Sequence, residues 1–263
     1  MAIYTCFDMI RDCREGKAQG WRFFASNFIA PLRTLLRHYA GTADVEAFLR
    51  SLLHDLREKD GGFFAALSPA PERQFLMLLR PRVLAVTENM APRECALRLE
   101  TLTAALRDYS PVERQITWME TMSYDIAGTA ALMRVSEETV QRLRRRTGEL
   151  LRAHLDRWSE TTLRDNGRAL GQAAAAEAPE HAVQFRELTD LIDGRTTWQG
   201  RQELEPRLVS SWHNLGLLCS LREADAAISQ SKPLGESEVA PYLKLLDVPA
   251  ARGGFWSRLV RPR

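Results

Sequence analysis

Five arginines lie between Thr139 and Arg152, in a chain of 263 residues whose overall net charge is +2. The single acid in that stretch is Glu149, so the segment carries a net charge of +4 from five arginines and one glutamate. Guanidinium groups pair with phosphate oxygens and release the counterions that surround a nucleic acid. The segment therefore predicts phosphate binding, and the alternative is a solvated arginine face on a helix that packs against its neighbours.

The residues around these arginines predict two helices joined by a tight polar turn. Small apolar side chains recur at helical spacing between Ile126 and Met133, which suits a close crossing of helices. Ser136 stands where an N-cap belongs, and Glu137 and Glu138 suit the positive end of a helix dipole, so the second helix should start near Glu137. Its buried stripe is predicted at Val140, Leu143, Thr147, Leu150 and Leu151. This arrangement is typical of a helix-turn-helix that binds DNA.

The run Tyr109–Arg114, the segment Thr129–Ser136 and the arginine-rich helix together resemble region 4 of a bacterial sigma-70 factor, particularly of the extracytoplasmic-function group. The resemblance implies that this domain reads the upstream promoter element and touches the polymerase flap. It places eight residues at the major groove or its phosphates: Ser136, Glu138, Thr139, Gln141, Arg142, Arg144, Arg145 and Arg146. Arginine suits guanine and Gln141 suits adenine, whereas short hydroxyl side chains suit phosphates.

The N-terminal third, over Met9–Phe24 and Pro31–Tyr39, is similar to the opening of sigma region 2. Read without the family, its apolar residues recur at steps of three and four and predict the core of an amphipathic helical pair, formed by Trp21, Phe24, Phe28, Leu32, Leu35, Leu36 and Tyr39. A further helix is predicted over residues 44–56. The resemblance implies that this helix grips core RNA polymerase, through Asp44, Glu46, Arg50 and Asp55.

Another helix is predicted over residues 72–86, where Pro81 should kink or end the first part. Its place in the chain corresponds to the family's helix that opens the minus-ten element. Family members continue that helix with basic and aromatic residues that stack on flipped bases, whereas here no aromatic residue lies between Phe75 and Tyr109. The sequence thus leaves two functions open: a sigma-factor-like transcription initiation protein, and a degenerate sigma relative that acts as a protein-interaction or DNA-binding regulator without promoter opening.

Beyond residue 183 the chain resembles a zinc-binding anti-sigma domain. That family's signature has a histidine followed by cysteines four and seven positions later, since zinc needs such ligands. Aligned on Trp212, this chain has Arg207, Ser211 and Asn214 at those places. None of them replaces an imidazole or a thiolate, and His213 and Cys219 face different sides of a helix. No metal and no cofactor is expected, and the resemblance implies an anti-sigma partner, within this chain or separate.

The sequence therefore predicts an all-α protein. Its expected parts are a sigma region 2-like helical domain (1–90), a linker helix (91–108), a region 4-like helix-turn-helix domain (109–158), a linker (159–182), a small anti-sigma-like helical domain (183–248) and a basic tail (249–263).

Composition favours a soluble, intracellular protein. Apolar residues make up 45% and charged residues 27% of the chain. The four cysteines are scattered, and no signal peptide or membrane-spanning run is found, so the expected compartment is the cytoplasm with no membrane partner. The five histidines are isolated and no hydrolase, metalloprotease or nucleotide-binding motif occurs, so the chain is not expected to be an enzyme.

Overall fold

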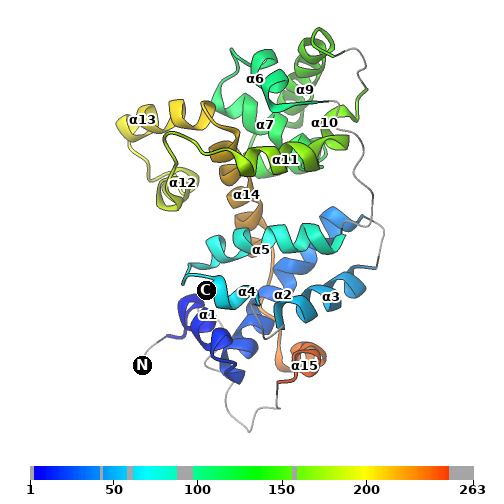
Figure 1. Cartoon of the computed structure of the whole chain (residues 1–263), viewed down its shortest axis with the longest axis vertical. Coiled ribbons are helices and arrows are strands. Elements are labelled where there is room, and N and C mark those ends of the chain that lie inside the picture. Colours follow the sequence, from blue (N-terminus) through cyan, green and yellow to red (C-terminus); the bar gives the residue numbers. More distant parts are fainter. Residues whose placement is uncertain (1–2, 42–43, 58–61, 88–96, 156–158, 249–263) are drawn as a thin grey trace. The chain divides into compact units, whose positions relative to one another are not determined.

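A computed structural model describes residues 3–41, 44–57, 62–87, 97–155 and 159–248 (Figure 1). All the regular secondary structure in these ranges is helical, and no strand is found there, so the all-α prediction is confirmed. The chain divides into two compact units, the first formed by residues 1–89 and 224–263 and the second by residues 90–223. The boundary between them falls inside one helix, α14 (Trp212–Ser229).

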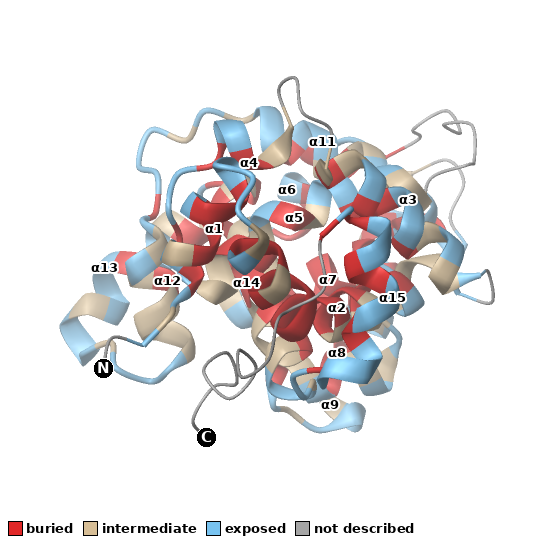
Figure 2. Ribbon diagram, turned by 90° about the horizontal axis from the view of Figure 1, so that it is seen from below, coloured by how far each residue is buried: buried red, intermediate tan, exposed pale blue. Residues whose placement is uncertain are grey.

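The first unit is built around one long helix. Its helices are α1 (Cys6–Arg14), α2 (Ala18–Ala40), α3 (Val45–Arg57), α4 (Phe63–Ala66), α5 (Glu72–Thr87) and α15 (Glu236–Leu245). Four of them, α1, α3, α5 and α15, pack directly against α2. Because it is covered from several sides, α2 is buried along most of its length, as Figure 2 shows.

The core of the first unit is aromatic, as the sequence predicted. Trp21, Phe24, Phe28 and Leu32 are all buried, and the rings of Phe28 and Phe75 meet edge to face with centroids 4.7 Å apart. Such pairs add to the free energy gained by removing the rings from water. These residues form the core of the unit.

Helix α5 runs from Glu72 to Thr87 without ending at Pro81. Of the two expected effects of Pro81, a kink or an end of the helix, the end is therefore wrong. Pro81 itself is exposed, whereas Leu79 and Val83 on either side of it are buried. Packing of the buried face against α2 and α3 offsets the hydrogen bond that the proline ring removes.

The second unit surrounds α7 (Pro111–Thr121). Its other helices are α6 (Leu99–Ala105), α8 (Ile126–Met133), α9 (Glu137–Arg152), α10 (Thr162–Asp165), α11 (Gly167–Ala176), α12 (Phe185–Ile192), α13 (Trp198–Val209) and the first part of α14. α8 and α9 pack on one side of α7, and α10, α11 and α13 also contact it. On α14, the ring of Trp212 stacks on Trp118 of α7, with centroids 5.2 Å apart.

The division of the chain differs from the one expected from the sequence. Residues 183–248 do not form a unit of their own: those up to Glu223 belong with the helix-turn-helix, and the rest belong with the N-terminal helices. The stretch 159–182, expected to be a linker, contains α10 and α11, which pack on α7. Of the expected linker helix, α6 is present, while residues 91–96 and the basic tail 249–263 lie outside the described residues.

Candidate nucleic-acid interface

The predicted turn between two helices is present in the second unit. α8 ends at Met133, and Arg134 follows it with a φ of 55°, in the left-handed region. The N–H groups of Arg134 and Val135 both donate to the carbonyl oxygen of Ala130. This C-cap satisfies a carbonyl that the end of a helix otherwise leaves unpaired, and it reverses the chain within three residues.

The start of α9 also follows the sequence prediction. Ser136 adopts an extended conformation, and its Oγ accepts a hydrogen bond from the backbone N–H of Thr139 at 3.2 Å. Glu137 is the first helical residue, and Glu137 and Glu138 both lie in the first turn. The N-cap satisfies a backbone N–H at this end of the helix, and the two carboxylates interact favourably with the positive end of the helix dipole.

One side of α9 is buried against the rest of the unit. Four of the five predicted stripe residues are buried (Val140, Leu143, Thr147, Leu151), and Leu150 is half-buried. The hydroxyl of Thr147 lies 3.3 Å from the hydroxyls of both Tyr109 and Thr117, which fixes the helix against α7. The stripe therefore sets the rotation of α9 and decides which arginines face outward.

The opposite side of α9 presents Glu138, Gln141, Arg142 and Arg145, which we call the outward face of α9. These positions follow helical spacing, so their side chains lie on one surface. All four residues are exposed. The side chain of Arg145 is 84% exposed and lies 3.6 Å from Glu149, one turn further on. Such an exposed pair contributes little, so Arg145 can exchange its partner for a phosphate.

Arg142 is the least constrained arginine of the outward face. Within the described ranges, its guanidinium forms no hydrogen bond or ion pair. Together with Arg145 it offers two cations on the same side of the helix, one turn apart.

Ser136 is exposed and Thr139 is half-buried at the start of α9, where short hydroxyls lie close to the free N–H groups of the first turn.

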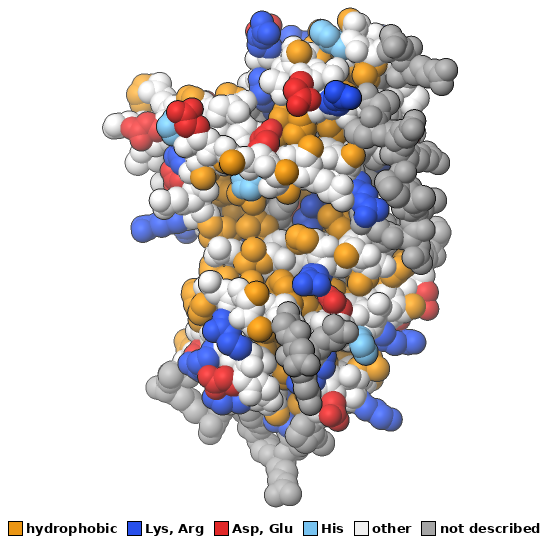
Figure 3. Space-filling model, viewed as in Figure 1, with side chains coloured by type: hydrophobic (Ala, Val, Ile, Leu, Met, Phe, Trp, Pro, Cys, Tyr) orange, Lys and Arg blue, Asp and Glu red, His pale blue; other side chains and the backbone are white. Residues whose placement is uncertain are grey.

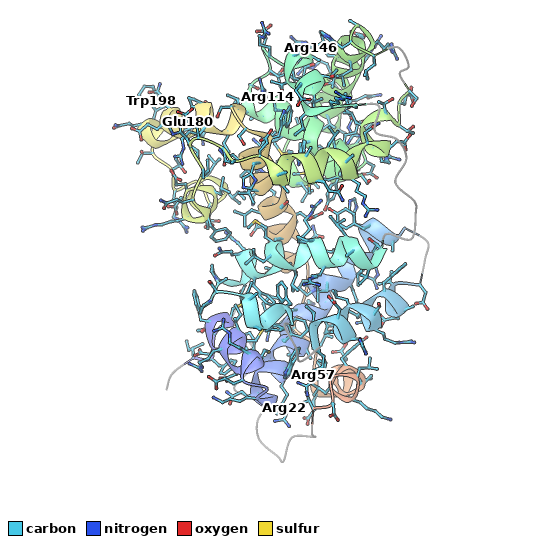
Figure 4. The ribbon with its side chains drawn as sticks, in the orientation of Figure 1. Arg22, Arg57, Arg114, Arg146, Glu180 and Trp198 are labelled. Carbon is cyan, nitrogen blue, oxygen red and sulfur yellow. The ribbon has the colours of Figure 1, made fainter. Side chains whose placement is uncertain are left out.

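Arg146 lies at the edge of this surface, on the side toward α7 (Figure 4). Its Nη1 is 3.6 Å from Oε1 of Glu113, and its guanidinium carbon lies 5.0 Å from the centre of the Tyr109 ring. These two contacts hold the charge beside α7, although the side chain is still 57% exposed. Arg146 is thus accessible but already engaged within the unit.

Arg144 points into the unit, which corrects its predicted place at the DNA. Its Nη2 donates to the carbonyl oxygen of Tyr124 at 2.6 Å and to Oγ1 of Thr129 at 2.9 Å. Its Nε lies 3.4 Å from Oε2 of Glu120, and the side chain is 15% exposed. The physical reason is register: Arg144 follows the buried Leu143 and faces the crossing of α7 and α8.

Burial shifts the pKa of both members of this internal pair, Arg144 and Glu120. Desolvation lowers the pKa of Arg144, and the charge of Glu120 acts in the opposite direction. Desolvation likewise raises the pKa of Glu120, against the effects of Arg144 and Arg164. The pair therefore serves to join α7, α8 and α9, and removing either partner alone would leave an uncompensated buried charge.

An exposed arginine in the turn, Arg134, was not among the predicted DNA-binding residues. Arg134 occupies the turn before α9, with its backbone in the left-handed region, and is exposed. Helical periodicity ends at Met133, so spacing gave no way to predict the direction of this side chain. On the side of the molecule drawn in Figure 3, the lysines and arginines of the described residues are scattered among acidic and uncharged side chains.

Two of the four predicted polymerase-binding residues lie near the two ends of α3. Asp44 is exposed, and its Oδ1 accepts hydrogen bonds from the N–H groups of Glu46 at 3.0 Å and Ala47 at 3.1 Å. Asp55 is half-buried and lies 3.3 Å from Nη1 of Arg82 on α5. Both carboxylates thus have a structural role, as a helix cap and as a link between helices.

The other two residues, Glu46 and Arg50, lie one turn apart on α3. Oε1 of Glu46 is 2.7 Å from Nε of Arg33, and its Oε2 accepts a hydrogen bond from the hydroxyl of Tyr242 at 2.9 Å. Arg50 is exposed. α3 therefore presents Arg50 freely, whereas Glu46 is already bound to α2 and α15.

The three residues that stand at the zinc-ligand positions of the anti-sigma signature form hydrogen bonds instead. Arg207 donates to Oε1 of Glu187 at 2.6 Å, and Ser211 donates to Oε2 of Glu177 at 2.9 Å. Asn214, which is completely buried, accepts from the N–H of Val183 at 3.1 Å. These bonds fasten α13 and α14 to residues 177–187. Among the described residues, no group of three or more His, Cys, Asp or Glu side chains is placed to hold a metal ion.

Replacing Asn214 with alanine is expected to lower the free energy of unfolding by about 3 kcal/mol. Besides accepting from Val183, the buried side chain donates to the carbonyl oxygens of His181 and Arg207, each at 3.0 Å, and the variant would lose all three hydrogen bonds. Urea unfolding of the Asn214→Ala variant measures the change. Ser210→Ala, at an exposed neighbouring residue, is the control, and an equal effect in both variants would contradict this role of Asn214.

The described part of the molecule is thus an all-helical protein with a capped helix, a turn and a basic second helix in one of its two units. The chain matches no protein-family model, and comparisons with curated proteins and with solved structures find no match either. No helix in the described ranges combines the length and hydropathy that are needed to cross a membrane.

Proposed function

We propose that this chain is a sigma-factor-like transcription initiation protein. It binds core RNA polymerase through the first unit and double-stranded promoter DNA through the helix-turn-helix of the second, and its C-terminal residues regulate it. The observation that carries the proposal is the outward face of α9, where Arg142 and Arg145 project on the side opposite the buried stripe. Such a protein would act in the cytoplasm, where core polymerase and promoters are found, and would need no cofactor.

The geometry of α8 and α9 suits docking in a major groove. A single α-helix fits that groove, and a guanidinium can form two hydrogen bonds with the edge of a guanine. Gln141, next to Arg142, can do the same with adenine. Ser136, Thr139 and Arg134 surround the positive end of the helix and suit phosphates, which fix the register of a protein on DNA. Glu138 would disfavour bases that offer no donor in the major groove, because a carboxylate accepts only from the amino groups of cytosine or adenine.

The alternative function, a degenerate sigma relative that does not open promoters, draws support from α5. In this helix Arg73 is 2.7 Å from Asp225, and Arg82 is 3.3 Å from Asp55. Arg80 donates twice to the hydroxyl of Tyr39, at 3.1 and 2.8 Å. The arginines that could hold a separated DNA strand are thus engaged within the first unit. A protein of this kind would bind polymerase or DNA and regulate transcription without melting the duplex.

Two measurements on the full chain test the proposal. The first is binding of the purified protein to core RNA polymerase, followed by co-elution in gel filtration. The second is run-off transcription from fragments of the source genome, with and without the protein. Arg142→Ala/Arg145→Ala is the matched variant, which should retain polymerase binding and lose transcripts because the two arginines lie in the other unit.

The outcomes separate the two functions. Polymerase binding together with new transcripts supports the initiation protein. Polymerase binding with no transcript and no permanganate-reactive thymines, which mark open DNA, selects the regulator. A chain that neither binds core polymerase nor yields a transcript is not an initiation factor.

A further inference from the structure

The last described residues of the chain return to the N-terminal helices. We call residues 231–248 the C-terminal strap. The N–H of Leu234 donates to the carbonyl oxygen of Ser26 at 2.8 Å, and the Ser26 hydroxyl donates back to the carbonyl oxygen of Leu234, also at 2.8 Å. Ser26 is completely buried in the middle of α2, so this reciprocal pair fixes the start of the strap on that helix.

Helix α15, the helical part of the strap, then lies beside α2 and α3 (Figure 1). Its apolar residues enter the core of the first unit rather than forming a core of their own. The strap residues buried in this way are Leu234, Val239, Tyr242, Leu243, Leu246 and Val248. On the other side of α15, Leu245 is 50% exposed. The strap thus covers a surface that α2 and α3 would otherwise present.

The polar centre of this contact is a cluster of three side chains. The hydroxyl of Tyr242 donates to Oε2 of Glu46 at 2.9 Å and accepts a hydrogen bond from Nη2 of Arg33. Arg33 also pairs with Glu46 through Nε at 2.7 Å and lies over the Tyr242 ring, 5.1 Å from its centre. Burial, followed by the bond to Glu46, raises the pKa of Tyr242, while Arg33 and Arg50 act in the opposite direction.

This cluster coincides with the surface assigned to the polymerase. Glu46 is one of the four residues proposed to bind it, and Arg50, another of them, is close enough to α15 to influence Tyr242 electrostatically. α15 supplies an amphipathic helix that is complementary to this surface in both charge and apolar contact. A partner that used Glu46 would have to displace Tyr242 first.

The strap can also detach without unfolding of α2 and α3, the helices that it covers. α15 has ten residues, with Pro241 inside it, and a helix of that length is marginal in water when nothing packs against it. α2 has 23 residues and is held by three further helices, α1, α3 and α5. The strap can therefore detach as a local unit, while the helices beneath it keep most of their contacts.

We propose that the C-terminal strap occupies, in the free protein, the α2–α3 surface that core RNA polymerase takes in the complex, so that α15 must leave before polymerase binds. This inference rests on the proposed function and adds its regulation: an autoinhibitory contact within one chain. The apparent affinity for polymerase is then the intrinsic affinity multiplied by the fraction of molecules with the strap open.

The test uses the full chain and core polymerase. Tyr242→Ala removes the ring and hydroxyl that bind Glu46, and it should tighten polymerase binding by about tenfold or more, measured by fluorescence anisotropy of the labelled chain. Tyr242→Phe keeps the ring and should give a smaller gain. Leu245→Ala changes the exposed side of the same helix and should bind as the unchanged chain does. Equal or weaker binding by Tyr242→Ala than by the unchanged chain overturns the inference.

Hydrogen exchange gives a second readout that does not depend on affinity. In Tyr242→Ala, the amides of α15 should exchange faster while those of α2 stay protected, which also shows that the variant is folded. Addition of polymerase to the unchanged chain should release the amides of α15. If polymerase binds and α15 stays protected in the complex, the inference is wrong while the proposed function stands. If neither chain binds polymerase although α15 is released in the variant, the proposed function fails.

Discussion

Replacing both Arg142 and Arg145 with alanine is expected to weaken binding of double-stranded DNA by about a hundredfold, since each arginine of the outward face contributes about 1.4 kcal/mol. Both guanidinium groups are exposed, and neither is part of the buried stripe of α9, so the fold should be unaffected. The slope of log affinity against log salt should fall by about two units if both groups contact phosphates. Fluorescence anisotropy at several salt concentrations measures affinity and slope together.

Two control variants distinguish a DNA contact from a general loss of charge. Arg186→Ala removes an arginine whose side chain is 90% exposed on α12, in the same unit, and should leave both affinity and slope unchanged. Arg144→Ala should lower the melting temperature, because it breaks the buried pair with Glu120, but should not change the slope. A salt slope that is the same in the double variant and the unchanged chain would remove the outward face of α9 from the interface.

Replacing Arg114 with methionine is expected to lower the free energy of unfolding by about 3 kcal/mol or more, and the melting temperature by about 10 °C. Arg114 is 6% exposed, and it donates to the carbonyl oxygens of Val209 at 2.8 Å, Arg107 at 3.1 Å and Tyr109 at 3.3 Å (Figure 4). Its guanidinium carbon also lies 5.8 Å from the centre of the Trp212 ring. Desolvation by burial lowers the pKa of Arg114.

The cost of this substitution is expected because methionine fills a similar volume but leaves three carbonyl groups without their donor. These carbonyls come from the segment before α7 and from the end of α13, so the loss should loosen the whole second unit. Arg107→Met, which changes an exposed side chain of the same segment, is expected to shift stability by less than about 0.5 kcal/mol. Thermal unfolding followed by circular dichroism compares the two variants, and similar melting temperatures would rule out this role of Arg114.

The elements whose formation depends on nearby residues could be predicted from the sequence. The cap at Ser136, the start of α9 at Glu137 and its buried stripe all follow from side chains within one or two turns of each other. The same holds for the aromatic core of α2, because Trp21, Phe24 and Phe28 repeat at helical spacing. In each case the local pattern and the final packing agree.

The partners of the C-terminal helices could not be predicted in this way. Periodicity shows that α15 has an apolar side, but it does not show which other helix covers that side. Leu234 meets Ser26 across 208 positions of the chain, and no local pattern indicates such a pairing. The sequence showed that three residues cannot bind zinc, but it did not show that they bond to the segment 177–187 instead. These residues are Arg207, Ser211 and Asn214.

Charge was also less informative than it appeared in the sequence. Four arginines of α9 between positions 142 and 146 were treated alike, yet one of them, Arg144, is internal and another, Arg146, is held by Glu113 and Tyr109. Neighbouring positions on a helix differ by about 100° in direction, so a cluster of like residues cannot all face one ligand. The candidate interface is accordingly smaller than predicted at α9 and gains Arg134 from the turn.

The chain order of the first unit has a consequence for how the protein is made. Its core combines residues from the first 89 positions with residues after position 223, and the whole second unit is translated between them. At about 5–20 residues per second, the ribosome needs roughly 7 to 27 seconds to synthesise that insertion. During this time α2 and α3 lack the strap, so the nascent chain exposes an apolar α2–α3 surface to chaperones before the finished protein covers it.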